Sequence, residues 1–189
     1  MKLLGIAGSL REGSYNRSLL RAAREVLPEG VELVECEIGG LPFYDGDVEA
    51  AGDPEPVVAL KNAIRDADAL LIATPEYNHC VPGVLKNAID WASRPARSSV
   101  LTDRPIAILG ASTGGSGTAR AQAHLRDGLT YTRGLVLPLP EVLVGHAAAK
   151  FDDDGNLTDP STRAEIRDLL VALGAWTRRL RLADEAAAS

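Results

Sequence analysis

Five short apolar runs alternate along the chain with segments of helical periodicity, and this alternation limits the possible folds more than any other feature. Between the runs, apolar residues recur at spacings of three and four, most regularly from Val81 to Ala92, so each segment can bury one helix face. Strands that alternate with helices predict a parallel sheet covered by helices on both sides. The predicted strands are residues 2–7, 31–35, 69–74, 105–110 and 135–138.

The length of the chain predicts a single globular domain. Its 189 residues are enough to bury a proper core, and we expect one domain over residues 1–189 with a frayed tail at 184–189. Asp159 is placed to cap the last helix. The predicted helices cover residues 19–27, 57–67, 81–92, 117–132 and 160–182.

This order of elements predicts an α/β fold with a doubly wound parallel sheet. Such sheets bind ligands at the carboxyl ends of their strands, near the point where the strand order reverses. The loops expected at that edge are residues 8–16, 75–81 and 111–117. We therefore expect the functional site to be built from these three loops.

Charge and hydropathy exclude several classes of partner. The net charge of −6 gives the chain no electrostatic footprint for nucleic acid or for an anionic membrane surface. No stretch approaches the roughly 18 apolar residues of a membrane span, and the first residues do not read as a signal segment, so we expect a cytoplasmic protein. Cys36 and Cys80 are far apart and outside any CxxC spacing, and no metal site is expected.

The first of the three loops has the residue types of a phosphate site. Ser9 and Ser14 offer hydroxyl groups, Asn16 offers an amide, and Arg11 offers a charge-assisted donor. The helix that follows would point its free backbone N–H groups at the same place. Ser14 is also placed to cap that helix, and capping and phosphate binding are compatible.

Other ligand-binding and catalytic motifs match less well. Gly110 and Gly115 have the spacing of a Walker A loop, but serine stands where that loop needs lysine, and no GxGxxG turn follows the first strand. A GxSxG motif at residues 110–114 keeps a serine hydrolase with Ser112 as nucleophile open as an alternative. Only two histidines follow Ser112, which leaves short spacings for a catalytic triad.

Three motifs in order resemble a known family: residues 8–16 read GSLREGSYN, residues 74–78 TPEYN and residues 82–91 PGVLKNAIDW. They closely resemble the flavodoxin-like NAD(P)H-dependent FMN reductases, the group that includes bacterial quinone and chromate reductases. The resemblance implies a five-stranded sheet in a three-layer α/β/α arrangement, with FMN as cofactor. It assigns to FMN binding Ser9, Leu10, Arg11, Ser14, Tyr15, Asn16, Pro75, Glu76, Tyr77, Asn78, Ser112 and Gly115.

The resemblance also divides these residues among parts of the cofactor. Residues 9–16 would hold the phosphate, residues 75–78 would lie along the isoalloxazine ring, and residues 112–115 would close the other side. Tyr77 would offer flat apolar contact to the ring, with ordinary packing or a subunit interface as the alternative. No side chain is expected to act as acid or base, because the flavin itself carries the hydride chemistry, and no role is assigned to His79 or Cys80.

The implied activity is transfer of a hydride from NADPH or NADH to FMN, followed by transfer of electrons to a small-molecule acceptor. Quinones, free flavin, azo dyes and metal oxyanions remain open as acceptors, as does the choice between the two nicotinamide donors. Relatives are commonly homodimers or homotetramers, with helix 86–91 as a plausible contact. A flavodoxin-type electron carrier without NAD(P)H turnover is the non-enzymatic alternative, because fold alone does not decide function.

Overall fold

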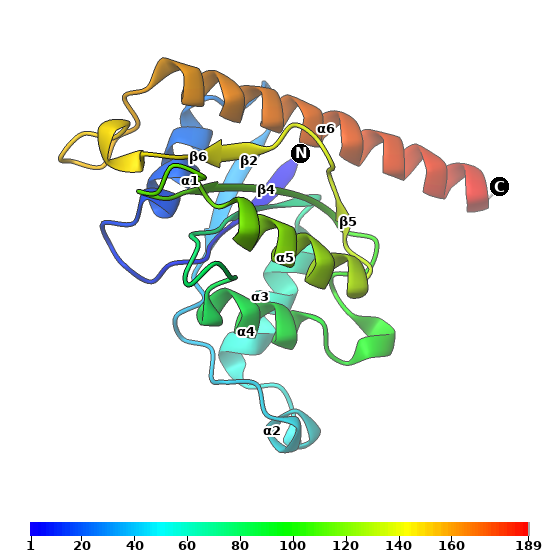
Figure 1. Ribbon diagram of the computed structural model, residues 1–189. Helices are drawn as coiled ribbons and strands as arrows, with labels where there is room; N and C mark the ends of the chain where they lie inside the picture. Colours follow the sequence, from blue (N-terminus) through cyan, green and yellow to red (C-terminus); the bar gives the residue numbers. More distant parts are fainter. Residues whose placement is uncertain (189) are drawn as a thin grey trace.

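The computed structural model describes residues 1–188, which form one parallel sheet with helices on both of its faces (Figure 1). The strand order is β2-β1-β3-β4-β5, and β6 also pairs with β4. Every pairing is parallel, and this order is that of flavodoxin-like folds. The strands are β1 (Lys2–Ala7), β2 (Glu32–Cys36), β3 (Ala69–Ala73), β4 (Pro105–Ala111), β5 (Leu135–Val136) and β6 (Val142–Val144).

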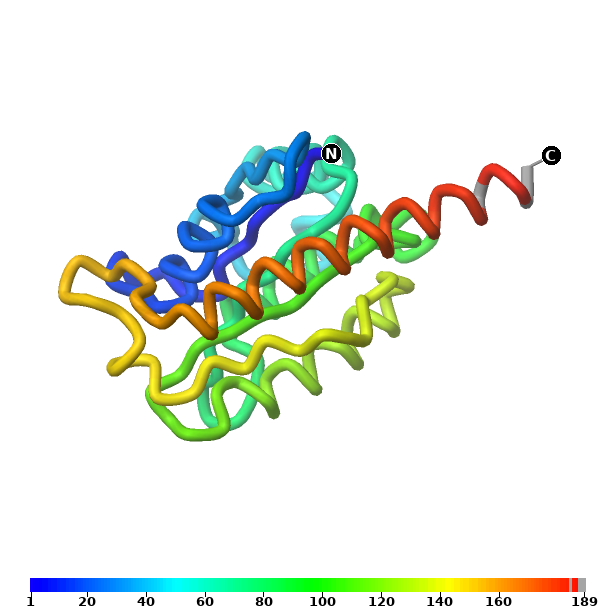
Figure 2. Tube along the Cα trace, turned by 90° about the horizontal axis from the view of Figure 1, so that it is seen from above, coloured from blue at the N-terminus to red at the C-terminus, as the bar shows by residue number. Residues whose placement is uncertain are grey.

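The helices form two layers. Helices α1 and α6 cover one face of the sheet, and α3, α4 and α5 cover the other. Figure 2 shows α6 lying along the sheet, with its C-terminal part extending past it. The helices are α1 (Tyr15–Glu25), α2 (Gly46–Ala51), α3 (Glu55–Asp66), α4 (Gly83–Ala92), α5 (Ala119–Tyr131) and α6 (Pro160–Ala188).

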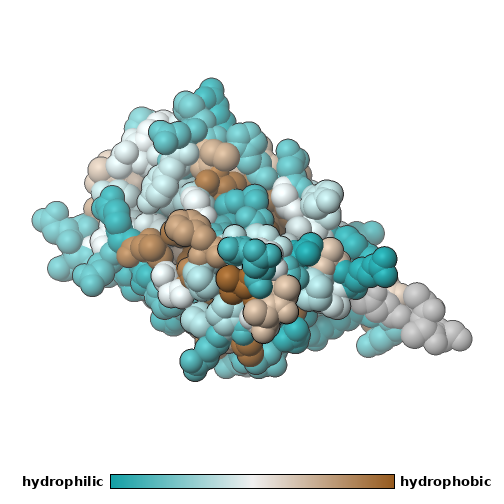
Figure 3. Space-filling model, turned by 90° about the horizontal axis from the view of Figure 1, so that it is seen from below, coloured by the Kyte–Doolittle hydropathy of each residue, from teal (hydrophilic) through white to brown (hydrophobic). Residues whose placement is uncertain are grey.

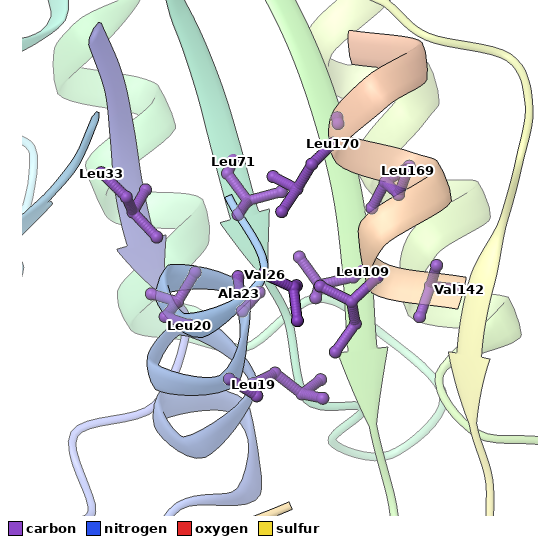
Figure 4. Close-up of a cluster of buried hydrophobic side chains, with 14 of the residues drawn as sticks. Leu19, Leu20, Ala23, Val26, Leu33, Leu71, Leu109, Val142, Leu169 and Leu170 are labelled. Carbon is purple, nitrogen blue, oxygen red and sulfur yellow. The ribbon is translucent and has the colours of Figure 1, made fainter. Parts of the chain in front are cut away.

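The core lies on both sides of the sheet, as the apolar runs predict. Strand β3 is buried along its whole length, since a central parallel strand is covered by helices on each face. On one side, Leu19 and Leu20 of α1 and Leu169 and Leu170 of α6 pack against the strands (Figure 4). The other side is filled by side chains of α3, α4 and α5, such as Leu85.

The predicted elements agree with the structure where burial is strong. Strands β1 to β4 match their predicted bounds to within one residue, and Asp159 caps α6 by accepting the Thr162 N–H at 2.8 Å. Helix α6 runs to Ala188 instead of ending near residue 182. Ser189, the last residue of the tail expected to fray, lies outside the described residues.

The sequence missed one strand and one helix. A single strand was expected at 135–138, but the chain pairs with β4 twice, as β5 and β6, on either side of Pro138 and Pro140. Proline has no N–H to donate to a ladder, so the pairing is interrupted there. Helix α2 buries no residue, so its sequence has no apolar periodicity from which it could be predicted. Its N-terminus is capped by Asp45, which accepts the Asp47 N–H at 2.8 Å.

The topology brings three loops to one edge of the sheet. The order of β2, β1 and β3 places the switch point between β1 and β3, whose loops leave the sheet at their carboxyl ends. The loop that follows β4 leaves at the same edge. None of the described helices combines the length and apolar composition that crossing a membrane requires.

Candidate functional site

A cavity of about 160 Å³ opens where the loops after β1, β3 and β4 meet. All three of the loops expected to form the site contribute to its walls. Nine of the twelve candidate residues line it, the exceptions being Leu10, Asn78 and Gly115. The lining residues are Ser9, Arg11, Ser14, Tyr15, Asn16, Pro75, Glu76, Tyr77, Ala111, Ser112 and Thr113.

The first loop and the start of α1 form the candidate anion site. Ser14 caps α1 by accepting the Asn16 N–H at 3.2 Å. The N–H groups of Tyr15 and Arg17 have no acceptor within the part of the chain that the structure describes, and they lie at the positive end of an eleven-residue helix. Among the described residues, the exposed Arg11 guanidinium donates only to the Gly13 carbonyl, at 3.4 Å, so most of its donors remain available.

Ser9 and Tyr77 connect the first loop to the second. The Ser9 hydroxyl is buried and lies 3.4 Å from the Tyr77 hydroxyl, and it also accepts the Arg11 N–H at 3.4 Å. Tyr77 is 47% exposed, so its ring is not enclosed by the core. Its ring therefore stands beside the cavity and is accessible from solvent.

The second loop is a tight hairpin. Tyr77 and Cys80 exchange backbone hydrogen bonds of 3.1 and 2.9 Å, and Asn78 and His79 between them have φ angles of 51° and 61°. Two central residues with positive φ are what a type I′ turn requires, and asparagine tolerates that conformation well. Asn78 and His79 are thus placed at the exposed tip of the hairpin and outside the walls of the cavity.

Glu76 fastens this hairpin to α5. Its Oε2 accepts the N–H groups of Arg120 and Ala121, both at 3.0 Å, and its Oε1 lies 3.0 Å from His79 Nδ1. The carboxylate thereby caps a helix whose own N-cap residue, Thr118, makes no side-chain cap bond. Burial alone would raise the pKa of Glu76, but the bonds from Ala121, His79 and Arg120 outweigh it and lower the pKa below its ordinary value.

The side-chain amide of Asn16 is directed at the end of β4. Its Oδ1 accepts the Ala111 N–H at 2.9 Å, and its Nδ2 donates to the Ala111 carbonyl at 3.0 Å. The sequence suggested a phosphate contact for this amide, and in the structure its partner is Ala111, the last residue of β4. No local pattern announces this pairing, since the two residues are 95 positions apart.

The third loop shows no sign of a catalytic triad. Ser112 Oγ accepts the Gly114 N–H at 3.2 Å, and no imidazole bonds to it among residues 1–188. The first glycine of the GxSxG motif has a packing role, because a Cβ on Gly110 would lie 2.1 Å from Thr118 Oγ1. Gly115 lies against His146, where a Cβ would come within 3.2 Å of Nε2. The contact of Gly110 gives the first glycine of the motif a packing role that needs no hydrolase chemistry.

Two lining residues were not among the candidates. Ala111 and Thr113 flank Ser112 in the loop already expected to form the third wall, so position in that loop was the available signal. Leu10, by contrast, is exposed and packs close to Gly39, where a Cβ would lie 3.1 Å from its Cδ2. Within the described residues, no group of three His, Cys, Asp or Glu side chains could hold a metal ion.

Comparison with known proteins gives a consistent result. Residues 1–149 match the profile of the family described as NADPH-dependent FMN reductase. An NAD(P)H-dependent FMN reductase from Pseudomonas aeruginosa is 50% identical over 181 residues, covering 96% of this chain and 97% of that protein. A 2-hydroxy-1,4-benzoquinone reductase from a Burkholderia species is 41% identical over 182 residues, covering 96% and 99%. A solved flavoenzyme NAD(P)H:acceptor oxidoreductase from Paracoccus denitrificans has a TM-score of 0.86 at 35% identity, covering 94% of this chain and 97% of that one.

Proposed function

Because the chain belongs to the NADPH-dependent FMN reductase family and is therefore an NAD(P)H-dependent flavin oxidoreductase, we propose that the cavity between its three loops holds FMN. When bound, FMN supplies the redox chemistry, accepting a hydride from NAD(P)H and passing electrons to a second substrate. The protein supplies binding and orientation. This division of labour explains why the site can function without an acid or base side chain.

The observation that carries the proposal is the set of donors at the start of α1. The start of α1 offers two free backbone N–H groups, at Tyr15 and Arg17, and the side chains of Ser9, Ser14 and Arg11 line the cavity beside it. A terminal phosphate carries two negative charges and several acceptor oxygens, which this donor set fits. The phosphate end of FMN would therefore lie against the first loop.

The ring end of the cofactor would lie between the other two loops. Pro75 to Tyr77 form one wall, and the Tyr77 ring offers a flat, partly apolar surface. Ala111, Ser112 and Thr113 form the opposite wall, where small side chains permit a planar group to approach the backbone. Leu10 in the first loop, Asn78 in the second and Gly115 in the third do not line the cavity, and we keep them in the proposed site as neighbours of residues that do.

We propose a quinone as the electron acceptor. Relatives that align over nearly the whole chain are named as quinone reductases, including the Burkholderia enzyme at 41% identity.

Residues 1–189 would act as a single FMN-binding domain, since α6 packs on α1 and β4 as part of the same body.

We further propose that the chain assembles as a homodimer or homotetramer through α4 and α5. A groove of about 300 Å³ between these helices is lined by apolar side chains such as Val81, Ile89 and Leu125, and Tyr131 beside it is 89% exposed. Figure 3, which looks onto the side where α2 and α4 lie, shows apolar groups among hydrophilic ones. Trp91 takes no part in such a contact, since it is fully buried. Light scattering of the wild type and of Tyr131→Glu tests this assembly: a monomeric wild type would refute it.

The decisive experiment for the cofactor is an absorption spectrum of the protein soaked in FMN and desalted. We expect retained flavin bands that bleach on anaerobic addition of NADPH or NADH, followed by recovery on addition of a quinone. Bands that bleach but do not recover with quinone would refute the proposed acceptor. A colourless protein after the soak would refute the proposed cofactor site.

A further inference from the structure

We infer that Asn16 is a positioning residue that joins the first and third walls of the cavity, and that it is not a ligand of the phosphate. This inference rests on the proposed function, because it divides the proposed FMN site into residues that touch the cofactor and one that holds the walls. Asn16 is the second residue of α1 and is 2% exposed. Both polar atoms of its side chain are paired with the N–H and C=O groups of Ala111.

The position of Ala111 in the sheet explains why it needs such a partner. In β4, the Leu109 carbonyl bonds to the Thr74 N–H on the side of β3, whereas the Ser112 N–H bonds to the Val144 carbonyl on the side of β6. Backbone groups two residues apart point the same way in a strand, so the polar groups of Ala111 face the β3 side. There the chain turns away at Pro75, which has no N–H.

Asn16 takes the place of the missing strand residue. Its primary amide presents one acceptor and one donor in a plane, matching the N–H and C=O groups of one backbone residue. Aspartate would lack the donor, and serine would offer only one atom. Because Ala111 is buried, its N–H and C=O would otherwise be unpaired, at a cost that proteins rarely tolerate.

The consequence for the cofactor differs from that of a phosphate ligand. Asn16 connects the helix that begins at the anion site to Ala111, and Ala111 to Thr113 form the wall assigned to the ring. Loss of the amide would therefore misplace the ring wall and weaken binding of any flavin. Loss of a phosphate ligand would weaken binding of FMN and spare riboflavin, which has no phosphate.

Fluorescence titrations with FMN and with riboflavin distinguish these roles. We expect Asn16→Ala to weaken binding of both flavins by a similar factor, on the order of tenfold. Arg11→Ala, the phosphate-ligand comparison, should weaken FMN by a larger factor than riboflavin. Leu173→Ala, a buried core variant of α6, controls for lost stability and should leave both dissociation constants unchanged while the protein remains folded.

The inference is overturned if Asn16→Ala weakens FMN binding and leaves riboflavin binding unchanged. A wild type that binds neither flavin would refute the proposed function instead. If Asn16→Ala does not fold, the wild type still decides, through the NMR scalar coupling across the hydrogen bond from Asn16 Nδ2 to the Ala111 carbonyl carbon. We expect that coupling with and without FMN, and its loss on addition of FMN would contradict the positioning role.

Discussion

Replacing Glu76 with alanine should loosen the second wall of the cavity from α5. The carboxylate accepts two N–H groups in the first turn of α5, from Arg120 and Ala121, and Thr118 supplies no cap of its own. Glu76 therefore acts as the N-cap of a helix that begins more than forty positions later in the chain. Without it, both N–H groups lose their acceptor and the hairpin loses its anchor.

The size of the effect follows from these bonds. An N-cap contributes about 1 to 2 kcal/mol to stability. A negative charge at a helix N-terminus adds about 0.5 kcal/mol. Glu76→Ala should therefore lower the free energy of unfolding by about 2 kcal/mol, which corresponds to roughly 4 to 8 °C in Tm for a chain of this length. Glu76→Gln keeps an oxygen acceptor and should lose about half as much.

The effect should also depend on pH, because the pKa of Glu76 is lowered in the folded protein. A lowered folded-state pKa gives stability that is present above the unfolded-state pKa and is lost as the pH falls through the folded value. The Tm difference between wild type and Glu76→Gln should thus be largest near neutral pH. It should shrink as the pH falls below the ordinary glutamate value of 4.5.

Thermal denaturation followed by circular dichroism tests this, with Glu29→Ala as the control at an exposed position. Titration of the same variants with FMN tests whether the hairpin is still held in place. The affinity for FMN should fall with Glu76→Ala and stay constant with Glu29→Ala. The reasoning fails if Glu76→Ala lowers Tm no more than Glu29→Ala does. It also fails if the gap to Glu76→Gln stays constant from neutral to acidic pH.

Three further predictions concern the cavity and the packing of the loop beside it. Arg11→Ala should release FMN on desalting while the rate of reduction per bound flavin stays at the wild-type value, and unchanged retention would remove Arg11 from the phosphate site. Steady-state kinetics with NAD(P)H and a quinone should give parallel double-reciprocal lines, because both substrates would use one flavin face, whereas intersecting lines would contradict this. Gly110→Ala should cost more than about 3 kcal/mol, since its Cβ would lie 2.1 Å from Thr118 Oγ1 and 2.3 Å from the Thr74 carbonyl oxygen; an unchanged Tm would disprove that packing.

The sequence predicts those features of the fold that depend on local patterns. Strand β3 can be predicted because burial on both faces makes its sequence continuously apolar. The cap at Ser14 can be predicted because a serine precedes a segment of helical periodicity. Helix α2 could not be predicted, because it buries no side chain and its sequence therefore shows no helical spacing of apolar residues. The division of the last predicted strand depends on Pro138 and Pro140, whose presence in the segment signals a break but does not show that pairing resumes.

The candidate site likewise contains residues that could be predicted from local sequence and residues whose bonding partners could not. Residue types alone assign Ser9, Arg11 and Ser14 to the proposed anion site, because hydroxyls and a cation beside a helix start suit a phosphate, and all three residues line the cavity. The partners of Asn16 and Glu76 could not be predicted, because each side chain bonds to backbone groups brought near by the tertiary fold. Polar residues in a ligand loop are therefore easily assigned to the ligand when their bonds serve the loop itself.

The contacts between walls have a thermodynamic consequence for cofactor binding. Asn16 joins the first wall to the third, Ser9 meets Tyr77 of the second, and Glu76 fixes the second to α5. Because these bonds form within the protein, the loops are ordered when the chain folds, and less ordering entropy is lost when a flavin binds. Affinity for FMN should then depend partly on bonds within the protein, such as those of Asn16, which is why the comparison of FMN with riboflavin separates a phosphate ligand from a positioning residue.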